Sequence, residues 1–298
     1  MDNDIKKVLL VVNPCSGQSS KRATVEEIID KFSDDYKFSI HKTTCQGDAT
    51  NIVKRELDDH DLVVCCGGDG TFNETINGVL RSGVDVPIGY IPAGSTNDFA
   101  ASLKLPTNVL DAARAIVEGT PHHYDVGKFG DRYFSYVASF GVFTKASYAT
   151  PQSVKNALGH TAYILSGIQE LSQLHTTHMR LELDDTVVED DFLFGAVSNS
   201  VSVGGILTLD PKQVDMTDGK FELLLVRAPK DLSEISECIQ ALQSQKYNCR
   251  MITFRTAEYV RAIGAPEICW TLDGERAEGQ AIINIHNLHH AIRLIQRG

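Results

Sequence analysis

The sequence has no run of about 18 apolar residues, so no segment predicts a membrane-spanning helix. Lys6 and Lys7 precede only the short apolar run 8–12, and we therefore expect no secretory signal peptide. The seven cysteines, an odd number, show neither a CxxC pair nor the spacing of zinc ligands. This pattern argues against a disulfide framework and indicates a reducing, cytoplasmic compartment.

Positive charge is also scarce, with 28 Lys and Arg against 39 Asp and Glu and a net charge of −11. Nucleic-acid binding and purely electrostatic membrane docking are therefore disfavoured. No GxxxxGK[ST] motif occurs, which excludes a P-loop with its phosphate-binding lysine. The 298 residues, 42% of them hydrophobic, suffice for one large globular domain or two smaller ones.

The first 120 residues alternate between strand and helix patterns. Predicted strands are Val8–Val12, Phe38–Lys42, Leu62–Cys66 and Ile88–Ile91, and predicted helices are Val25–Phe32, Ala49–Leu57, Asn73–Leu80 and Asn108–Val117. This rhythm predicts an α/β domain with a parallel, Rossmann-like sheet over residues 1–122. Ligands of such sheets bind beyond the carboxyl ends of the strands.

After Thr120-Pro121 the predicted strands follow one another, with hairpin signals at Gly130-Asp131 and Asp184-Asp185. Two helical stretches, 154–171 and 232–242, interrupt them. The remaining segments are predicted strands: Tyr124–Phe129, Tyr133–Ser139, Met179–Leu183, Val187–Phe194, Phe221–Val226, Ile252–Thr256, Tyr259–Ile263 and Ile282–His286. The pattern predicts a mostly antiparallel β-sandwich domain over 123–298, whose last residues can pack back on the first domain. An active site is expected between the two domains.

The most informative stretch is 61–74, where an apolar run ends in three glycines that bracket Asp69. It predicts a buried strand, a tight turn and the start of a helix, with backbone N–H groups that suit an anion. A carboxylate in such a turn repels phosphate unless Mg²⁺ or a proton-accepting step offsets the repulsion. The turn therefore suggests a nucleotide phosphate with a metal ion, and hence phosphoryl transfer.

Two more turns follow predicted strands. The turn 13–17 contains Asn-Pro and ends in Ser-Gly, and an ordinary strand-to-helix turn explains it equally well. In the turn 93–99, Ser95 and Thr96 offer hydroxyl groups and Asn97 an amide. Asp98 is either a ligand there or a carboxylate at a helix N-terminus.

Acidic residues also cluster in the second half of the chain. Asp215 and Asp218, with Gly219, suit a hard cation, although a polar hairpin turn is the alternative. Asp273-Gly274-Glu275 is, taken alone, an ordinary hairpin end. The histidines form no catalytic set, and those with helix-face spacing are more simply packed or solvated: His175, His178, His286 and His289.

Taken together, these motifs resemble the soluble bacterial diacylglycerol kinase and lipid kinase family, which is similar to the sphingosine kinases. The resemblance covers nearly the whole chain, and the segment 147–168 looks closest to the diacylglycerol kinase branch. The residues that carry it are Asn13-Pro14 with Ser16-Gly17, Gly67–Thr71 with Asn73-Glu74, Gly94, Asn97–Phe99, Asp125–Gly127, Asp218-Gly219 and Leu272–Glu275.

The resemblance implies an ATP- and Mg²⁺-dependent kinase that transfers the γ-phosphate to a lipid hydroxyl, most plausibly converting diacylglycerol to phosphatidic acid. It also implies transient, peripheral contact with the inner face of the membrane, a homodimer as one option, and no nucleic-acid partner. The implied nucleotide-binding residues are Asn13, Pro14, Cys15, Ser16, Gly17, Thr43, Gly67, Gly68, Asp69, Gly70, Thr71, Asn73, Gly94, Ser95, Asn97 and Asp98.

By the same resemblance, Asp69 would hold the catalytic Mg²⁺ through water, aided by Asp98 and Asp125. A structural Mg²⁺ would sit on the Asp218 side chain. The carbonyls of Asp215 and Lys220 would be its further ligands. Either Asp273 or Glu275 would take the proton of the lipid hydroxyl.

Two residues depart from the family pattern, because Gln18 and Ala101 stand where basic residues are common. Lys21, Arg22 or Lys104 could supply the missing positive charge. Two other functions remain open. One is a soluble-substrate kinase of the NAD kinase type, which shares the GGDGT turn, and the other is a nucleotide-binding module with weak or no catalysis.

Overall fold

In the computed structural model, the structure describes residues 5–17, 23–141, 176–203 and 207–297, so the predicted helix 154–171 lies outside the described residues. The chain divides into two compact units, residues 1–126 with 288–298 and residues 127–287. The division falls near the boundary expected from the sequence, and residues 288–298 group with the first unit. Two strands, β5 (Thr120–Phe129) and β17 (Ile282–Gln296), contain the points where the chain passes from one unit to the other.

The first unit is built on a parallel sheet in the order β4-β3-β1-β2, which confirms the predicted architecture. Arg293 and Leu294 of β17 pair in parallel with Pro87 and Ile88 and so add a strand beside β4. The strand bounds are β1 (Lys6–Val12), β2 (Tyr36–Lys42), β3 (Leu62–Gly67) and β4 (Pro87–Pro92).

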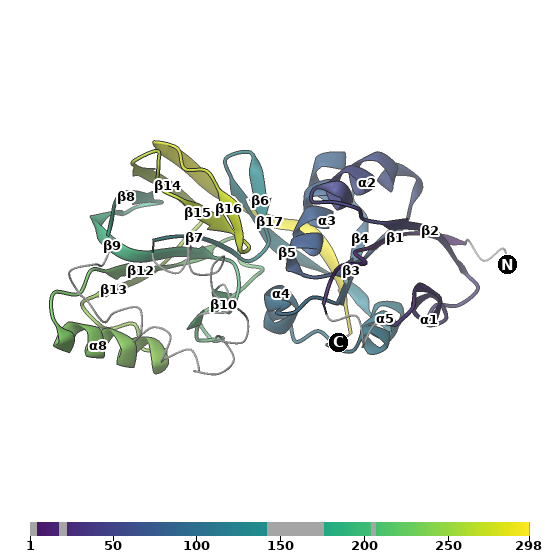
Figure 1. Ribbon diagram of the computed structural model, residues 1–298, viewed down its shortest axis with the longest axis horizontal. Helices are drawn as coiled ribbons and strands as arrows, with labels where there is room; N and C mark the ends of the chain where they lie inside the picture. Colours follow the sequence, from purple (N-terminus) through teal and green to yellow (C-terminus); the bar gives the residue numbers. More distant parts are fainter. Residues whose placement is uncertain (1–4, 18–22, 142–175, 204–206, 298) are drawn as a thin grey trace. The chain divides into compact units, whose positions relative to one another are not determined.

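Helices cover both faces of this sheet. Figure 1 shows α2 and α3 on one face and α1 and α5 on the other. Because both faces are covered, β3 is buried at every position and its sequence is a continuous apolar run. The helix bounds are α1 (Val25–Ile29), α2 (Asp48–Glu56), a short 3₁₀ turn η2 (Leu57–Asp59), α3 (Asp69–Ser82), α4 (Asp98–Ser102) and α5 (Val109–Glu118).

Local capping explains where two helices differ from the prediction. Helix α3 begins at Asp69 rather than Asn73, because Gly68 is extended and serves as its N-cap. Helix α1 starts with a capping box between Thr24 and Glu27 but ends at Ile29, short of the predicted Phe32. The first helical turn of α3 is therefore part of the predicted phosphate motif.

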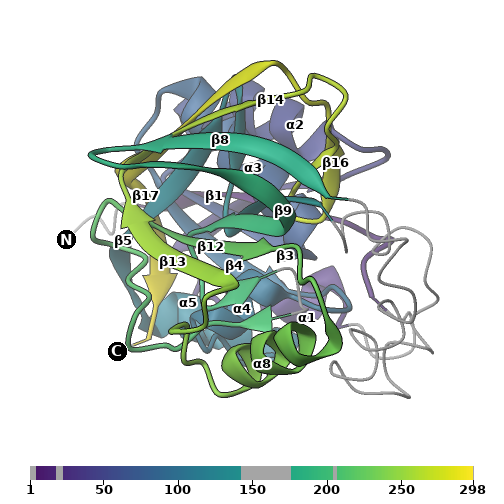
Figure 2. The same ribbon diagram turned by 90° about the vertical axis from the view of Figure 1, so that its left-hand side faces the viewer.

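In the second unit every described strand pairing is antiparallel, in agreement with the predicted sandwich. Strand β9 is its centre, since its first half pairs with β8 and its second half lies between β7 and β12. Both views show α8 alongside β12 and β13 (Figure 2). The bounds are β6 (Arg132–Phe134), β7 (Val137–Gly141), β8 (Thr177–Leu183), β9 (Val187–Ser198), β10 (Ser202–Val203), β11 (Leu207–Thr208), β12 (Phe221–Arg227), α8 (Leu232–Gln243), β13 (Ile252–Ala257), β14 (Tyr259–Gly264), β15 (Trp270–Leu272) and β16 (Glu275–Ala277).

Two details of the sequence prediction for this half are wrong. The predicted strand Tyr133–Ser139 is broken into β6 and β7, because Ser135 and Tyr136 turn their backbone N–H groups toward a carboxylate. The strand predicted at Ile282–His286 is longer than expected, since β17 includes His289 and runs to Gln296. Among the described residues, no helix is both long and apolar enough to cross a membrane.

Candidate active site

The turns that follow β1, β3 and β4 meet at one edge of the parallel sheet and bond to one another. We call residues 13–17, 67–73 and 93–98 the turn edge. Asn13 Nδ2 donates to Thr71 Oγ1 at 2.9 Å, and the Gly68 N–H donates to Ser16 Oγ at 3.2 Å. Thr43, just past the end of β2, is buried, and its N–H donates to the Val12 carbonyl at 2.9 Å. The structure therefore brings residues from the three predicted nucleotide motifs together.

Glycine is required at the turn edge by the packing of one turn on another. A Cβ at Gly94 would lie 2.6 Å from the Gly68 Cα and 2.7 Å from Asn97 Oδ1. Gly17 has φ +68°, and its Cβ would lie 2.4 Å from the Ala93 carbonyl oxygen. The Gly94 N–H donates to Asn97 Oδ1 at 2.9 Å, and Asn97 Nδ2 donates back to the Gly94 carbonyl at 3.0 Å. These contacts hold the turns in place without a ligand.

Asp69 joins two helix N-termini. It is the first residue of α3, and its carboxylate accepts hydrogen bonds from the N–H groups of Asp98 at 3.1 Å and Phe99 at 3.3 Å. Those two residues open α4, so the positive end of that short helix favours the negative charge. Asp98 itself is buried at the start of α4. Two of the three residues predicted to act on the metal, Asp69 and Asp98, are thus joined by a hydrogen bond.

The other residues of the turn edge have simpler surroundings. Cys15 is exposed, and its N–H donates to Asn13 Oδ1 at 2.9 Å, while Ser95 is also exposed. Glu74, one residue beyond the motif, accepts from the N–H groups of Gly47 at 2.7 Å and Ala49 at 3.2 Å. It therefore caps α2, whose N-cap glycine has no side chain to do so. Pro14 follows β1, and Gly70 and Asn73 lie on α3.

Asp125 has different neighbours. It is fully buried in β5, and one carboxylate oxygen accepts the His290 N–H at 2.8 Å. Asp125, His289 and His290 each offer a potential ligand atom for a metal, and these atoms all lie within 4.8 Å of one another. Within the described ranges, no other group of three or more such side chains meets this spacing. Asp69, Asp98 and Asp125 do not meet that spacing, so the predicted contact of all three with one ion through water remains a prediction.

In the second unit, both carboxylate oxygens of Asp273 accept hydrogen bonds. It sits between β15 and β16 with φ +50°, and one oxygen accepts from Ser135 N–H at 2.6 Å and Ser135 Oγ at 2.8 Å. The other oxygen accepts from the N–H groups of Tyr136 at 2.9 Å and Val137 at 3.0 Å. Burial raises the pKa of the Asp273 carboxyl, and these hydrogen bonds oppose that shift. Four donors match the roughly four lone-pair positions of a carboxylate.

Glu275, the other candidate base, is more open. It is the first residue of β16, its side chain is 37% exposed, and the Arg132 guanidinium lies 3.8 Å from its carboxylate. That guanidinium also donates to the Arg276 carbonyl at 3.0 Å. Of the two candidates, Glu275 has the more exposed carboxylate.

The predicted structural metal loop is ordered by its own side chains. Asp215 Oδ1 accepts from the Thr217 N–H at 3.0 Å and from Thr217 Oγ1 at 2.7 Å, and Asp218 Oδ1 accepts from the Lys220 N–H at 2.9 Å. The Lys220 carbonyl accepts from Asn287 Nδ2 at 3.0 Å. Both carboxylates are exposed, and each closes an Asx-type turn through Oδ1.

Sequence reasoning missed Glu222, which lies beside this loop. It is 1% exposed on β12, and its Oε2 has no hydrogen-bond partner. Burial and the charge of Asp218 raise its pKa to about 8. The buried Glu222 oxygen without a partner and the exposed carboxylates of Asp215 and Asp218 are oxygen donors of the kind that a hard cation prefers, so these residues suit Mg²⁺. The available signal was an acidic residue inside the apolar strand Phe221–Arg227.

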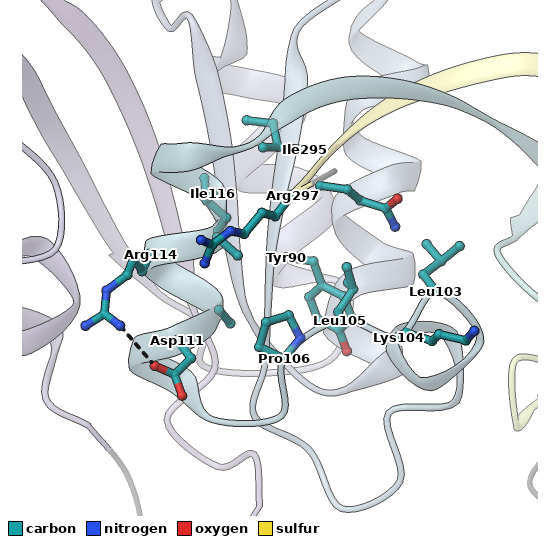
Figure 3. Close-up of a pocket in the computed structure, with 13 residues that line it drawn as sticks. Tyr90, Leu103, Lys104, Leu105, Pro106, Asp111, Arg114, Ile116, Ile295 and Arg297 are labelled. Carbon is teal, nitrogen blue, oxygen red and sulfur yellow. Dashed lines mark hydrogen bonds and ion pairs between the residues drawn. The ribbon is translucent and has the colours of Figure 1, made fainter.

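The basic substitutes proposed from the sequence are only partly described, since Gln18, Lys21 and Arg22 lie outside the described residues. Lys104 follows α4 with φ +55° and lines a cavity of about 340 Å³ in the first unit. Figure 3 shows this cavity, with Arg114 paired to Asp111 at 3.4 Å. None of the predicted site residues lines it, so this cavity is separate from the predicted nucleotide site.

Known proteins resemble the chain along most of its length. The model of the diacylglycerol kinase catalytic domain matches residues 7–129, and that of the YegS C-terminal NAD kinase beta sandwich-like domain matches residues 136–296. A diacylglycerol kinase of Bacillus subtilis (strain 168) is 32% identical over 274 residues, which cover 91% of this chain and 90% of that protein. One from Staphylococcus carnosus (strain TM300) is 31% identical over 293 residues, 97% of this chain and 94% of that protein.

Solved structures agree. A crystal structure assigned provisionally to a diacylglycerol kinase of Bacillus anthracis strain Sterne superposes with a TM-score of 0.80 at 26% identity, covering 99% of this chain and 98% of that one. The fold predicted from the sequence, an α/β domain followed by an antiparallel sandwich, is confirmed by these matches. The chain therefore belongs to the diacylglycerol kinase family, whose members are phosphotransferases that act on an alcohol group.

Proposed function

We propose that this protein transfers the γ-phosphate of ATP to a lipid hydroxyl, with diacylglycerol as the acceptor, and that it requires Mg²⁺. The observation that carries the proposal is the turn edge, where three strand-end turns and the Asp69 carboxylate are bonded together. Relatives that share most of the chain are named diacylglycerol kinases, which supports this acceptor.

Backbone N–H groups of the turn edge would bind the phosphates. Helix α3 starts at Gly68 without a side-chain cap, so the N–H groups of its first turn suit phosphate oxygens. The close packing of Gly68 on Gly94 keeps Cβ atoms away from that approach. In this arrangement backbone N–H groups would bind the phosphates, as a lysine does in a P-loop.

Oxygen donors around the turn edge fit Mg²⁺. Asp69 and Asp98, with Asp125, would hold the ion through water, and the bound ion would neutralise charge on the transferring phosphate. The two backbone hydrogen bonds to Asp69 fix the direction of its carboxylate before any ligand arrives. A second, structural Mg²⁺ would bind to Asp218 and to the carbonyls of Asp215 and Lys220, next to Glu222.

Glu275 would act as the base. The lipid hydroxyl oxygen forms a bond to the γ-phosphorus, the bond from that phosphorus to the bridging oxygen breaks, and ADP leaves. The hydroxyl proton passes to the Glu275 carboxylate. Asp273, with both oxygens occupied by Ser135, Tyr136 and Val137, would position the hairpin that carries Glu275.

Because the acceptor is a lipid, we also propose transient contact with the inner face of the cytoplasmic membrane. A homodimer is proposed from the resemblance alone, and sedimentation of the purified chain at several concentrations would test it. A single sedimenting species with the 32.7 kDa mass of one chain at all concentrations would contradict it.

The kinase test uses the full chain, γ-labelled ATP and Mg²⁺, with separate arms that contain diacylglycerol, sphingosine or NAD as acceptor. We expect labelled phosphatidic acid in the diacylglycerol arm and none from an Asp69→Asn variant. The matched control is Asp58→Asn, an exposed carboxylate at η2. ATP binding without a labelled product in any arm would overturn the proposal, and labelled NADP would move it to a soluble substrate.

A further inference from the structure

A second group of metal-binding side chains lies in the first unit. Asp125 on β5 and His289 and His290 on β17 each offer one ligand atom, and these atoms lie within 4.8 Å of one another. The carboxylate is fully buried and the two imidazoles are exposed. One carboxylate and two imidazoles are a donor set that a divalent metal ion can use.

An irregular backbone brings the two histidines together. Successive residues of a strand normally point to opposite faces, so neighbouring histidines should be separated. Here His290 has φ +54°, which breaks the alternation, and the two ring centroids lie 3.8 Å apart. The His290 N–H donates to Asp125 at 2.8 Å, which ties this irregular backbone to the buried carboxylate. A non-glycine residue in this conformation is strained unless its surroundings hold it there.

A third imidazole flanks the group. His123 lies two residues before Asp125 on β5, and alternate residues of a strand face the same side. Its ring centroid is 5.1 Å from that of His290. His123 is therefore a neighbour of the His290 ring, outside the group of three ligand atoms.

We propose that Asp125, His289 and His290 bind a divalent transition-metal ion of the Zn²⁺ type. Imidazole nitrogen prefers such ions, whereas Mg²⁺ prefers oxygen donors. Zn–N and Zn–O bonds of about 2.0–2.2 Å place tetrahedral ligand atoms about 3.4 Å apart. The exposed imidazoles reach that spacing from 4.8 Å by rotation of their side chains.

This site shares Asp125 with the Mg²⁺ network of the proposed kinase reaction, so an effect on turnover could not separate the two sites. The test therefore measures metal binding and not turnover. The full chain, freed of affinity tag and stripped with chelator, is titrated with Co²⁺ alone while its visible ligand-field absorption is recorded. We expect saturation near one equivalent, and displacement by Zn²⁺ but not by the same concentration of Mg²⁺.

Variants locate the ion. His289→Ala and His290→Asn should each weaken Co²⁺ binding at least about tenfold, and asparagine tolerates positive φ, so the backbone at position 290 is kept. His122→Ala, on the same strand β5, is the control and should bind as the parent protein does. Thermal unfolding without metal verifies that each variant is folded. The proposal would be overturned if no ligand-field bands appeared or if the parent protein and both variants bound Co²⁺ equally. It would also be overturned if the control lost as much affinity as the variants.

Discussion

The turn edge of the first unit and the loop 215–222 of the second both gather carboxylates, but they stabilise them in different ways. At the turn edge, Asp69 accepts two backbone N–H groups, and nearby Glu74 does the same. In the loop, Glu222 is buried with an oxygen that has no partner. The first region is preorganised by hydrogen bonds from the chain itself, whereas in the second the raised pKa of Glu222, about 8, leaves this side chain protonated unless a cation displaces the proton.

The same contrast separates the two carboxylates of the 273–275 hairpin. Asp273 is saturated by backbone and hydroxyl donors, while Glu275 is partly exposed and has one distant cation. A carboxylate whose two oxygens both accept hydrogen bonds from the backbone stabilises the fold. An exposed carboxylate can instead accept a proton from a substrate. Four substitutions test this distinction.

The largest expected effect is on catalysis by the open carboxylate. Glu275→Gln should lower kcat about 10²–10⁴-fold, the usual contribution of a general base, with no change in Tm. Turnover of diacylglycerol with labelled ATP measures it. Glu278→Gln, exposed on the same hairpin, is the control and should keep full activity. Full activity of the Glu275 variant would remove its assignment as the base.

The saturated carboxylate should affect stability instead. In the parent protein the backbone N–H donors bond to the Asp273 oxygens. In Asp273→Asn an amide NH₂ replaces one oxygen and cannot accept these hydrogen bonds, which should lower the free energy of unfolding by about 3 kcal/mol. Urea unfolding measures it, with the exposed Asp185→Asn as control. A variant as stable as the parent protein but without kinase activity would contradict the structural role and return Asp273 to the list of candidate bases.

The buried Glu222 side chain makes stability depend on pH. The folded-state pKa of Glu222 is raised to about 8 from 4.5, so between these values the folded protein holds a proton that the unfolded chain has lost. In chelator, the free energy of unfolding should therefore fall as pH rises through this window, by on the order of 1 kcal/mol per pH unit. Glu222→Gln should flatten this slope, as should saturating Mg²⁺ in the parent protein. If the free energy of unfolding changed with pH equally in the parent protein and the variant, this assignment to Glu222 would be wrong.

The smallest effect is expected for the cap of α2. Glu74→Ala removes the acceptor for the Gly47 and Ala49 N–H groups and should cost about 1 kcal/mol. Amide hydrogen exchange should quicken in the first turn of α2 and remain unchanged in α5. Faster exchange throughout the unit, or none, would show that Glu74 has a different role.

The turn edge was largely predictable from the sequence. Apolar runs ending at Asn13, Gly67 and Ala93 identified adjacent parallel strands, and the carboxyl ends of such strands share one edge. The bonds within it were not predictable. For example, the Asp69 carboxylate accepts hydrogen bonds from the N–H groups of Asp98 and Phe99. This contact depends on how β3 and β4 align, which local sequence does not encode.

The second unit was predicted less completely because its key contacts are distant in sequence. Asp273 bonds to Ser135–Val137 across more than 130 positions, and only this contact explains why the strand expected at 133–139 breaks. Glu222 was hidden because strand propensity says nothing about a charge inside an apolar run.

The pairing of β17 with β4 has a consequence for synthesis on the ribosome. Residues 7–126 can emerge and begin to fold, but the edge of β4 stays uncovered until Arg293 and Leu294 have been made. An uncovered strand edge can pair with another chain, so the nascent first unit is exposed to aggregation while the whole second unit is translated. Chaperone dependence should therefore be greatest during translation of residues 127–287.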